Sequence, residues 1–189
     1  MPMIYFKPLP ANKTQFIEFW SRLYKPSEYE HIYVKNIGKR LTKERILNLY
    51  RWKNYRKLSK HKRKSVLINF VDRLDVLSRL STNADVRKLL TSFSKGGPIW
   101  RIFWLHCWQP DRFPIYDQHV HRAMAFIKTG IREEIPKQDS EKLNSCIQAY
   151  LPFHNAFGQS DKRSVDKALW TFGKFLKEYN FPMEDQNGE

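Results

Sequence analysis

Residues 95–108 read KGGPIWRIFWLHCW, a turn followed by a segment that is apolar at nearly every position. Pro98 suits the first turn of a helix, and the paired glycines before it allow positive φ and close approach of another backbone. Trp100, Trp104 and Trp108 recur every four residues, which places them on one face of that helix. A helix that is apolar all round is buried, so we expect this one to run through the centre of the protein.

Outside this segment, apolar residues recur at helical spacing along most of the chain. The clearest sets are Phe16, Phe19, Trp20 and Leu23; Leu67, Phe70, Val71, Leu74 and Leu77; and Val165, Leu169, Phe172, Leu176 and Tyr179. Thr42 and Ser140 stand where N-caps are expected, and Gly130 where a helix should end. Only residues 32–34 resemble a strand. The pattern predicts an all-α protein of about eight helices, either as one compact body or as two lobes with a cleft between them.

The length of 189 residues is typical of a single domain. We expect one helical domain over residues 1–183 and a flexible tail at residues 184–189. No apolar run reaches the roughly 18 residues of a membrane span, and no secretory signal is recognisable, so we expect a cytoplasmic protein. Cys107 and Cys146 are too few for a disulfide framework or a four-cysteine cluster, and we expect both to be buried, reduced thiols.

The net charge points to a polyanionic partner. The chain has 34 Lys and Arg against 19 Asp and Glu, a formal charge of +15. Nucleic acid is the commonest partner of such a globule. The basic residues cluster in segment 52–64, WKNYRKLSKHKRK, which fits a solvated helix face and a phosphate-contacting surface equally well. Its candidates for phosphate contact are Lys60, Lys62, Arg63 and Lys64.

Residues 109–124 read QPDRFPIYDQHVHRAM, a short loop that leads into a new helix. Asp117 stands at the expected N-cap, where a carboxylate accepts backbone N–H bonds and is favoured by the positive end of the helix. Taken alone, it is an ordinary capping aspartate. Arg101, an isolated charge on the apolar helix before it, needs a buried acid, a phosphate or exposure at the helix start.

Together these two segments resemble the helix-hairpin-helix (HhH-GPD) DNA glycosylase superfamily. Its members carry a Gly-rich hairpin, a buried helix, a short loop with a proline and then Asp-x-His-Val-x-Arg, which Gly96-Gly97 and DQHVHR at residues 117–122 match. The resemblance implies that the hairpin amides grip a DNA phosphate and that Asp117 lies beside the scissile sugar. The hairpin departs from the family's Leu-Pro-Gly-x-Gly. We expect Lys95 to supplement its phosphate contact, because the lysine stands before the glycines; an unorthodox nucleophile at Lys95 is the less favoured alternative.

The resemblance also implies an activity. Family members that cut the strand carry a nucleophilic lysine just after the glycines, where this chain has Pro98, so we expect a monofunctional glycosylase that leaves an abasic site. Its substrate would be a damaged or modified base, including hypermodified phage bases, in DNA repair or in antiviral defence. An ionised Asp117 would stabilise the oxocarbenium-like sugar and orient the attacking water. No cofactor and no obligate protein partner is expected, and we expect a monomer.

The same reading assigns the remaining site residues. The candidates for the pocket of the flipped base are Trp52, Asn54, Tyr55 and Tyr116. The candidates for DNA contact, besides the basic segment, are Lys95, Gly96, Gly97, Arg101, His119 and Arg122, of which Arg122 could instead be a structural cation.

Three other readings compete. A non-catalytic DNA-binding or architectural protein on the same scaffold would use Asp117 only as an N-cap. A metal site built from His106, Cys107, His119 and His121 is disfavoured because His-x-His on a helix points its imidazoles apart. An RNA-binding protein is disfavoured because no RNP, KH or double-stranded-RNA signature is present.

Overall fold

The computed structural model describes residues 12–80, 84–93, 95–158 and 161–178. All regular structure within these ranges is helical, so the all-α prediction is confirmed there. The α-helices are α1 (Lys13–Arg22), α2 (Glu30–Asn36), α3 (Lys43–Lys53), α4 (Lys60–Val66), α5 (Leu74–Ser78), α6 (Val86–Ser92), α7 (Pro98–Trp108), α8 (Gln118–Thr129), α9 (Asp139–Asn144), α10 (Leu151–Asn155) and α11 (Lys162–Glu178). Two π-helical segments, η1 (Leu67–Val71) and η2 (Ser145–Tyr150), continue α4 and α9.

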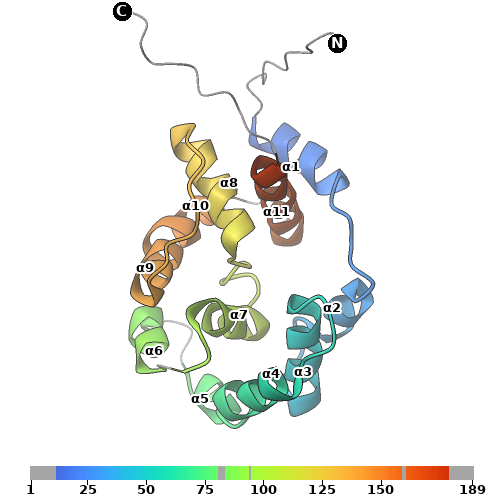
Figure 1. Ribbon diagram of the computed structural model, residues 1–189, viewed down its shortest axis with the longest axis vertical. Helices are drawn as coiled ribbons and strands as arrows, with labels where there is room; N and C mark the ends of the chain where they lie inside the picture. The colour runs from blue at the N-terminus through green and yellow to red at the C-terminus, as the bar shows by residue number, and fades with distance from the viewer. Residues whose placement is uncertain (1–11, 81–83, 94, 159–160, 179–189) are drawn as a thin grey trace, which may run out of the picture.

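Helix α7 occupies the centre of the arrangement, as its apolar sequence predicts (Figure 1). Helix α11 packs against α1 and α8 to form one group, while α2, α3, α4 and η1 pack together as another. The loop from α7 to α8 runs between the two groups (Figure 1). A single buried apolar cluster extends from Ile17 in α1 to Leu169 in α11, so the groups share one core.

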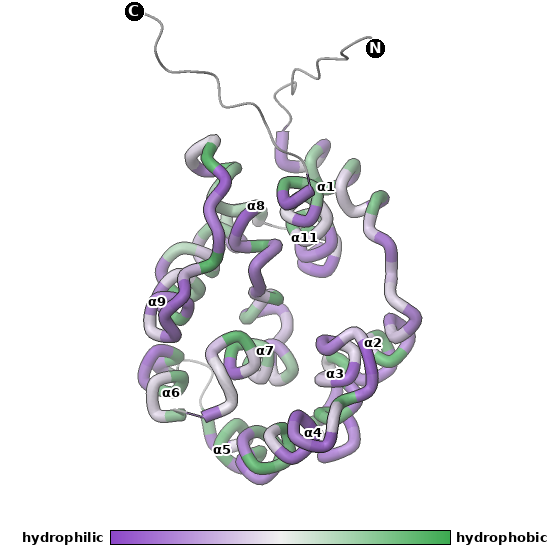
Figure 2. The backbone as a smooth tube through the Cα atoms, in the orientation of Figure 1, coloured by the Kyte–Doolittle hydropathy of each residue, from purple (hydrophilic) through white to green (hydrophobic). Residues whose placement is uncertain are grey.

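Almost every helix alternates hydrophilic and hydrophobic positions along its length (Figure 2). Amphipathic helices of this kind turn their apolar stripe toward the shared core. Trp104 lies in that core, and Cys107 and Cys146 are buried free thiols, as expected. Burial raises the pKa of both thiols above the ordinary range.

Local signals placed some helix ends correctly and others wrongly. Thr42 caps α3 by accepting a hydrogen bond from the Arg45 amide, and Gly130 ends α8 in the left-handed conformation. Ser140 is not an N-cap, because α9 begins at Asp139, with Gln138 at the N-cap position. Residues 32–34 belong to α2, not to a strand, because Tyr33 is buried against other helices. The predicted tail at residues 184–189 lies outside the described residues.

The hairpin before α7 depends on a glycine at one position. Gly96 has φ +97°, and a Cβ atom there would lie 2.6 Å from Cζ of Phe70 in η1. The π-helical segment therefore packs directly against the turn that begins the central helix.

Within the described residues, no helix combines the length and apolar character that a membrane crossing requires.

Candidate active site

Asp117 is the N-cap of α8, as the sequence predicts. Its Oδ1 atom accepts hydrogen bonds from the backbone amides of His119, at 2.9 Å, and Val120, at 3.3 Å. Its Oδ2 atom lies 2.8 Å from Nζ of Lys53. One carboxylate oxygen is thus held by the helix start, and the other faces a cation from a different helix.

Lys53 is the last residue of α3, and its ammonium group joins that helix to the start of α8. Both side chains are mostly buried, with exposed fractions of 8% for Lys53 and 15% for Asp117. Burial by itself raises the pKa of the Asp117 carboxyl, but the Lys53 charge and the hydrogen bonds outweigh it and hold that pKa below its ordinary value. Asp117 is therefore ionised at neutral pH.

A small cavity of about 20 Å³ adjoins this ion pair where α3, the α7–α8 loop and α11 meet. Its aromatic lining residues are Tyr24, Trp52, Tyr55 and Trp170. Its charged lining residues are Lys53, Asp117, Arg163 and Asp166. The space suits about one water molecule, so a nucleobase would enter only after side chains move.

Tyr55 stands on the exposed side of the cavity. It is 48% exposed, lies two residues beyond the end of α3 and packs 6.3 Å from the Trp170 ring, centroid to centroid. Its φ of +56° is unusual for a residue with a Cβ atom and costs about 1 kcal/mol. Such backbone strain is often retained at functional sites.

The opposite wall is fixed by an ion pair between α2 and α11. Arg163 Nη2 lies 2.6 Å from Oε1 of Glu30, and the indole N–H of Trp52 donates to Oε2 of Glu30 at 2.9 Å. The Arg163 guanidinium also lies over the rings of Tyr33 and Trp52. Trp52 is thereby held in one orientation against the cavity.

Two of the four predicted pocket residues, Trp52 and Tyr55, line the cavity. The other two do not. Tyr116 is buried beneath the loop, where its hydroxyl contacts Ser145 Oγ at 2.9 Å and His121 Nδ1 at 3.0 Å. Asn54 turns toward α4 and accepts a hydrogen bond from Lys62 Nζ at 2.6 Å. These two residues position the loop and the basic segment.

The basic segment lies beside the start of α7. Lys62 Nζ reaches Asn54 at the end of α3 and also lies 5.8 Å from the centre of the Trp100 ring in the first turn of α7. Lys60, Arg63 and Lys64 are exposed on α4, and Lys95 is exposed before the glycines. Gly97 caps α7 without a side chain, so no side chain occupies the amides of the helix start. Lys62 of the basic segment thus lies beside the start of α7, the helix that the predicted hairpin precedes.

The chain was compared with protein-family models, with curated proteins and with solved structures. None of them matches it. The functional reading therefore rests on the residues and their geometry.

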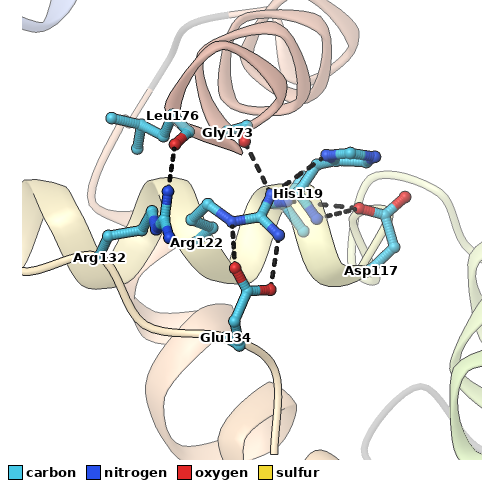
Figure 3. Close-up of polar contacts among 8 residues, drawn as sticks. Asp117, His119, Arg122, Arg132, Glu134, Gly173 and Leu176 are labelled. Carbon is cyan, nitrogen blue, oxygen red and sulfur yellow. Dashed lines mark hydrogen bonds and ion pairs between the residues drawn. The ribbon is translucent and has the colours of Figure 1, made fainter. Parts of the chain in front are cut away.

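Two predicted DNA contacts have intramolecular partners instead. Arg122 is 1% exposed; its Nε and Nη2 atoms donate to the Glu134 carboxylate at 3.0 and 2.6 Å, and Nη1 donates to the Gly173 carbonyl at 2.8 Å (Figure 3). This geometry favours the structural role that the sequence left open. Arg101 is also buried, and its guanidinium donates to the carbonyls of Leu90 and Phe93 at the end of α6, so it does not face a phosphate.

His119 is half-buried at the first turn of α8. Its Nδ1 atom lies 3.4 Å from Arg122 Nη1, and its ring packs edge-on against Trp170. Behind it the backbones of α8 and α11 touch, since a Cβ atom at Gly173 would lie 1.8 Å from the His119 carbonyl oxygen. The Asp117 end of α8 is therefore anchored to α11.

The remaining histidines of the metal reading have protein partners. His106 Nδ1 lies 2.7 Å from the Phe113 carbonyl and its Nε2 lies 2.9 Å from the Tyr33 hydroxyl. His121 contacts Tyr116 and Ser145. Among the described residues, no group of three or more metal-ligating side chains is assembled.

Sequence reasoning missed most of the charged lining of the cavity. Lys53 was hidden in the basic segment, and its partner Asp117 is 64 positions away. Arg163, Asp166 and Trp170 are spaced by three and four residues and so share one face of α11. A carboxylate directly after Val165, in an amphipathic helix, was the signal that could have identified this face.

Proposed function

We propose that this protein is a monofunctional DNA glycosylase that flips out a damaged or modified base, hydrolyses its N-glycosidic bond and leaves an abasic site. The proposal is carried by one observation: an ionised carboxylate, Asp117, at the head of a helix and on the wall of an aromatic cavity. Asp117 lines this cavity while its Oδ1 atom caps α8 and its Oδ2 atom pairs with Lys53.

The chemistry follows from the charge of that carboxylate. Breaking the bond between C1′ and the base nitrogen leaves positive charge on the sugar, and a negative group in a poorly hydrated site stabilises it strongly. Asp117 also provides an acceptor for a proton of the attacking water. That water bonds to C1′, its proton leaves through Asp117, and the bonding electrons depart with the base.

DNA attraction is supported by charge and by its distribution. Lys60, Arg63 and Lys64 are exposed on α4, whose Lys62 lies 5.8 Å from the centre of the Trp100 ring in the first turn of α7. When Lys and Arg side chains contact DNA phosphates, they displace the salt cations that are condensed there. Release of these counterions favours binding at low salt. Base extrusion costs a few kcal/mol, and the four aromatic side chains of the cavity provide stacking surfaces that offset it.

The monofunctional assignment is supported by the placement of the lysines. Lys95 is exposed before the glycines, and Lys53 Nζ is held in an ion pair with Asp117 Oδ2, which disfavours its use as a nucleophile. A borohydride-trapping assay with abasic DNA tests this point, and we expect no covalent protein–DNA adduct. A trapped adduct that disappears in Lys53→Met would identify a bifunctional enzyme.

A non-catalytic DNA-binding protein is the second candidate, and specific observations favour it. Both oxygens of Asp117 already have partners, and the cavity holds about one water molecule. In that case Asp117 would be an N-cap that also joins α3 to α8.

One experiment separates the two candidates. The wild type, Asp117→Asn and the control Asp111→Asn, an exposed acid of the same loop, are incubated with DNAs that carry damaged or hypermodified bases, phage genomes included. Free base and alkali-labile sites are then measured. We expect base release from the wild type and the control, and none from Asp117→Asn although it still binds DNA. Base release by Asp117→Asn at the wild-type rate would exclude a catalytic Asp117, and binding without any base release would favour the second candidate.

A further inference from the structure

We propose that one face of α11 recognises the flipped base, and that Asp166 and Trp170 on this face select a base with an exocyclic amino group beside a hydrogen-bond acceptor. This inference rests on the proposed function and names the substrate class of the same cavity.

Asp166 is a buried acid with unused hydrogen-bonding capacity. It is 4% exposed and lines the cavity, and its Oδ1 atom is buried without a hydrogen bond. His154 Nε2 lies 3.2 Å from this oxygen, within ion-pair distance, but the two atoms do not form a hydrogen bond, and both His154 ring nitrogens also lack hydrogen bonds. Buried polar atoms are almost always satisfied, so an unsatisfied carboxylate oxygen on a cavity wall indicates a ligand that supplies a donor.

Trp170 provides the complementary group. Its indole Nε1 is buried without a hydrogen-bond partner, and the residue lines the same cavity. It follows Asp166 by four residues on α11, so the two side chains are neighbours on one helix face. Its ring packs 5.6 Å from Tyr24 and 6.3 Å from Tyr55, centroid to centroid, so the indole N–H belongs to an aromatic wall.

The cations of the cavity lining are already engaged elsewhere. Lys53 is bound to Asp117, and Arg163 is bound to Glu30. Among the described residues, His154 is the one basic side chain within ion-pair distance of Asp166. The α11 face therefore carries an acceptor and a donor on neighbouring side chains; within the described residues neither atom has a hydrogen bond, and His154 is the ion-pair partner of Asp166.

This pair matches the edge of an amino-bearing base. A carboxylate accepts from the amino group of a cytosine-type or adenine-type base, while an indole N–H donates to the adjacent ring nitrogen. An oxo group in place of the amino group would turn lone pairs toward the carboxylate and leave a buried acceptor unpaired. Sites built on such pairing reject the mismatched analogue strongly.

The test uses two pairs of duplexes that differ only in that group: 5-hydroxymethylcytosine against 5-hydroxymethyluracil, and adenine against hypoxanthine. Binding is measured with the Asp117→Asn protein, and base release with the wild type. We expect the amino member of at least one pair to bind about tenfold more tightly than its oxo partner. Asp166→Asn, which places an amide donor where the acceptor was, should abolish or reverse that preference.

Two variants make the result specific. Trp170→Phe keeps the ring and removes the donor, so it should weaken binding of the preferred duplex without changing the melting temperature much. Asp75→Asn alters an exposed acid on α5 and should leave the preference unchanged. If Asp166→Asn does not fold, Trp170→Phe still decides the question.

The outcomes separate this inference from the proposed function. Base release by the wild type with an equal preference for both members, unaltered by Asp166→Asn and Trp170→Phe, would overturn the inference and leave the glycosylase intact. A binding preference that Asp166→Asn removes, without base release from any DNA, would support recognition by α11 and overturn catalysis. Equal binding of all four duplexes without base release would overturn both.

Discussion

Lys53 Nζ lies 2.8 Å from Asp117 Oδ2 and joins the last residue of α3 to the N-cap of α8. The two residues are 64 positions apart, so the contact depends on the complete fold. The same contact contributes to the stability of the fold and helps to keep the candidate catalytic carboxylate, Asp117, ionised.

Replacing Lys53 by methionine should therefore affect both properties. Loss of one partner leaves the mostly buried Asp117 charge uncompensated, which costs about 3 kcal/mol of unfolding free energy. The pKa of the Asp117 carboxyl should rise, because the attraction that opposes burial is removed. Urea unfolding measures the first effect, and an acid limb of the pH–rate profile displaced to higher pH measures the second. Lys57→Met, at an exposed position, is the control; an equal effect of the two variants would contradict this role for the pair.

His106 should make the protein less stable in mild acid. Burial lowers its pKa from about 6.5 to about 4, so the folded protein keeps it neutral while the unfolded chain binds a proton over that interval. Stability from this group is present above pH 6.5 and is lost as the pH falls toward 4, by about 3 kcal/mol in total. His106→Gln, whose amide can serve the same two partners, should reduce the difference between unfolding free energies at pH 7 and pH 4.5. If the unfolding free energies of the variant at pH 7 and pH 4.5 differ as much as those of the wild type, the acid sensitivity comes from other groups.

Gly173→Ala tests the contact between α11 and α8. The added methyl group would lie 1.8 Å from the His119 carbonyl oxygen. The methyl is fixed to the backbone of α11 and the carbonyl is part of the backbone of α8, so neither can rotate away. We expect a loss of about 3 kcal/mol or failure to fold, with base release reduced in any protein that does fold. Lys174→Ala, at the next and exposed position, should be close to neutral. A melting temperature for Gly173→Ala equal to that of the control would show that the helices separate easily.

Exchanging Lys60 and Lys64 for alanine tests the DNA surface. If both contact phosphates, the slope of log affinity against log salt should become shallower by about two, and binding should weaken for all sequences alike. Fluorescence anisotropy at several salt concentrations measures this. Lys128→Ala and Lys137→Ala, at exposed positions on α8 and before α9, form the matched control. Equal slopes for the two double variants would leave only nonspecific attraction by net charge.

The local part of the site could be predicted from sequence, and the tertiary part could not. Asp117 at the head of α8 and Gly96 at the turn before α7 follow from capping and turn chemistry within a few residues. Trp52 and Tyr55 were found because aromatic residues within a basic segment stand out. The glycosylase function itself, with its DNA partner, stays a prediction.

The side-chain environments that the sequence did not predict depend on which helix faces pack together. Arg122 has the charge of a phosphate ligand, but packing of α8 against α11 buries it and gives it Glu134 and Gly173 as partners (Figure 3). Tyr116 adjoins Asp117 in sequence yet points away from the cavity, because its hydroxyl contacts Ser145 and His121. Neither orientation is encoded in the residue type or its near neighbours.

The backbone contact at Gly173 also constrains how the cavity can widen. Because α8 and α11 touch at that point, the wall that carries Asp117 is joined directly to the wall that carries Asp166 and Trp170. Lys53 and Tyr55 line the same cavity from the end of α3. The proposed function requires a base to enter between α3 and these two walls, and we expect that entry to lengthen the Lys53–Asp117 contact. On that proposal Lys53 balances the Asp117 charge until a base is present.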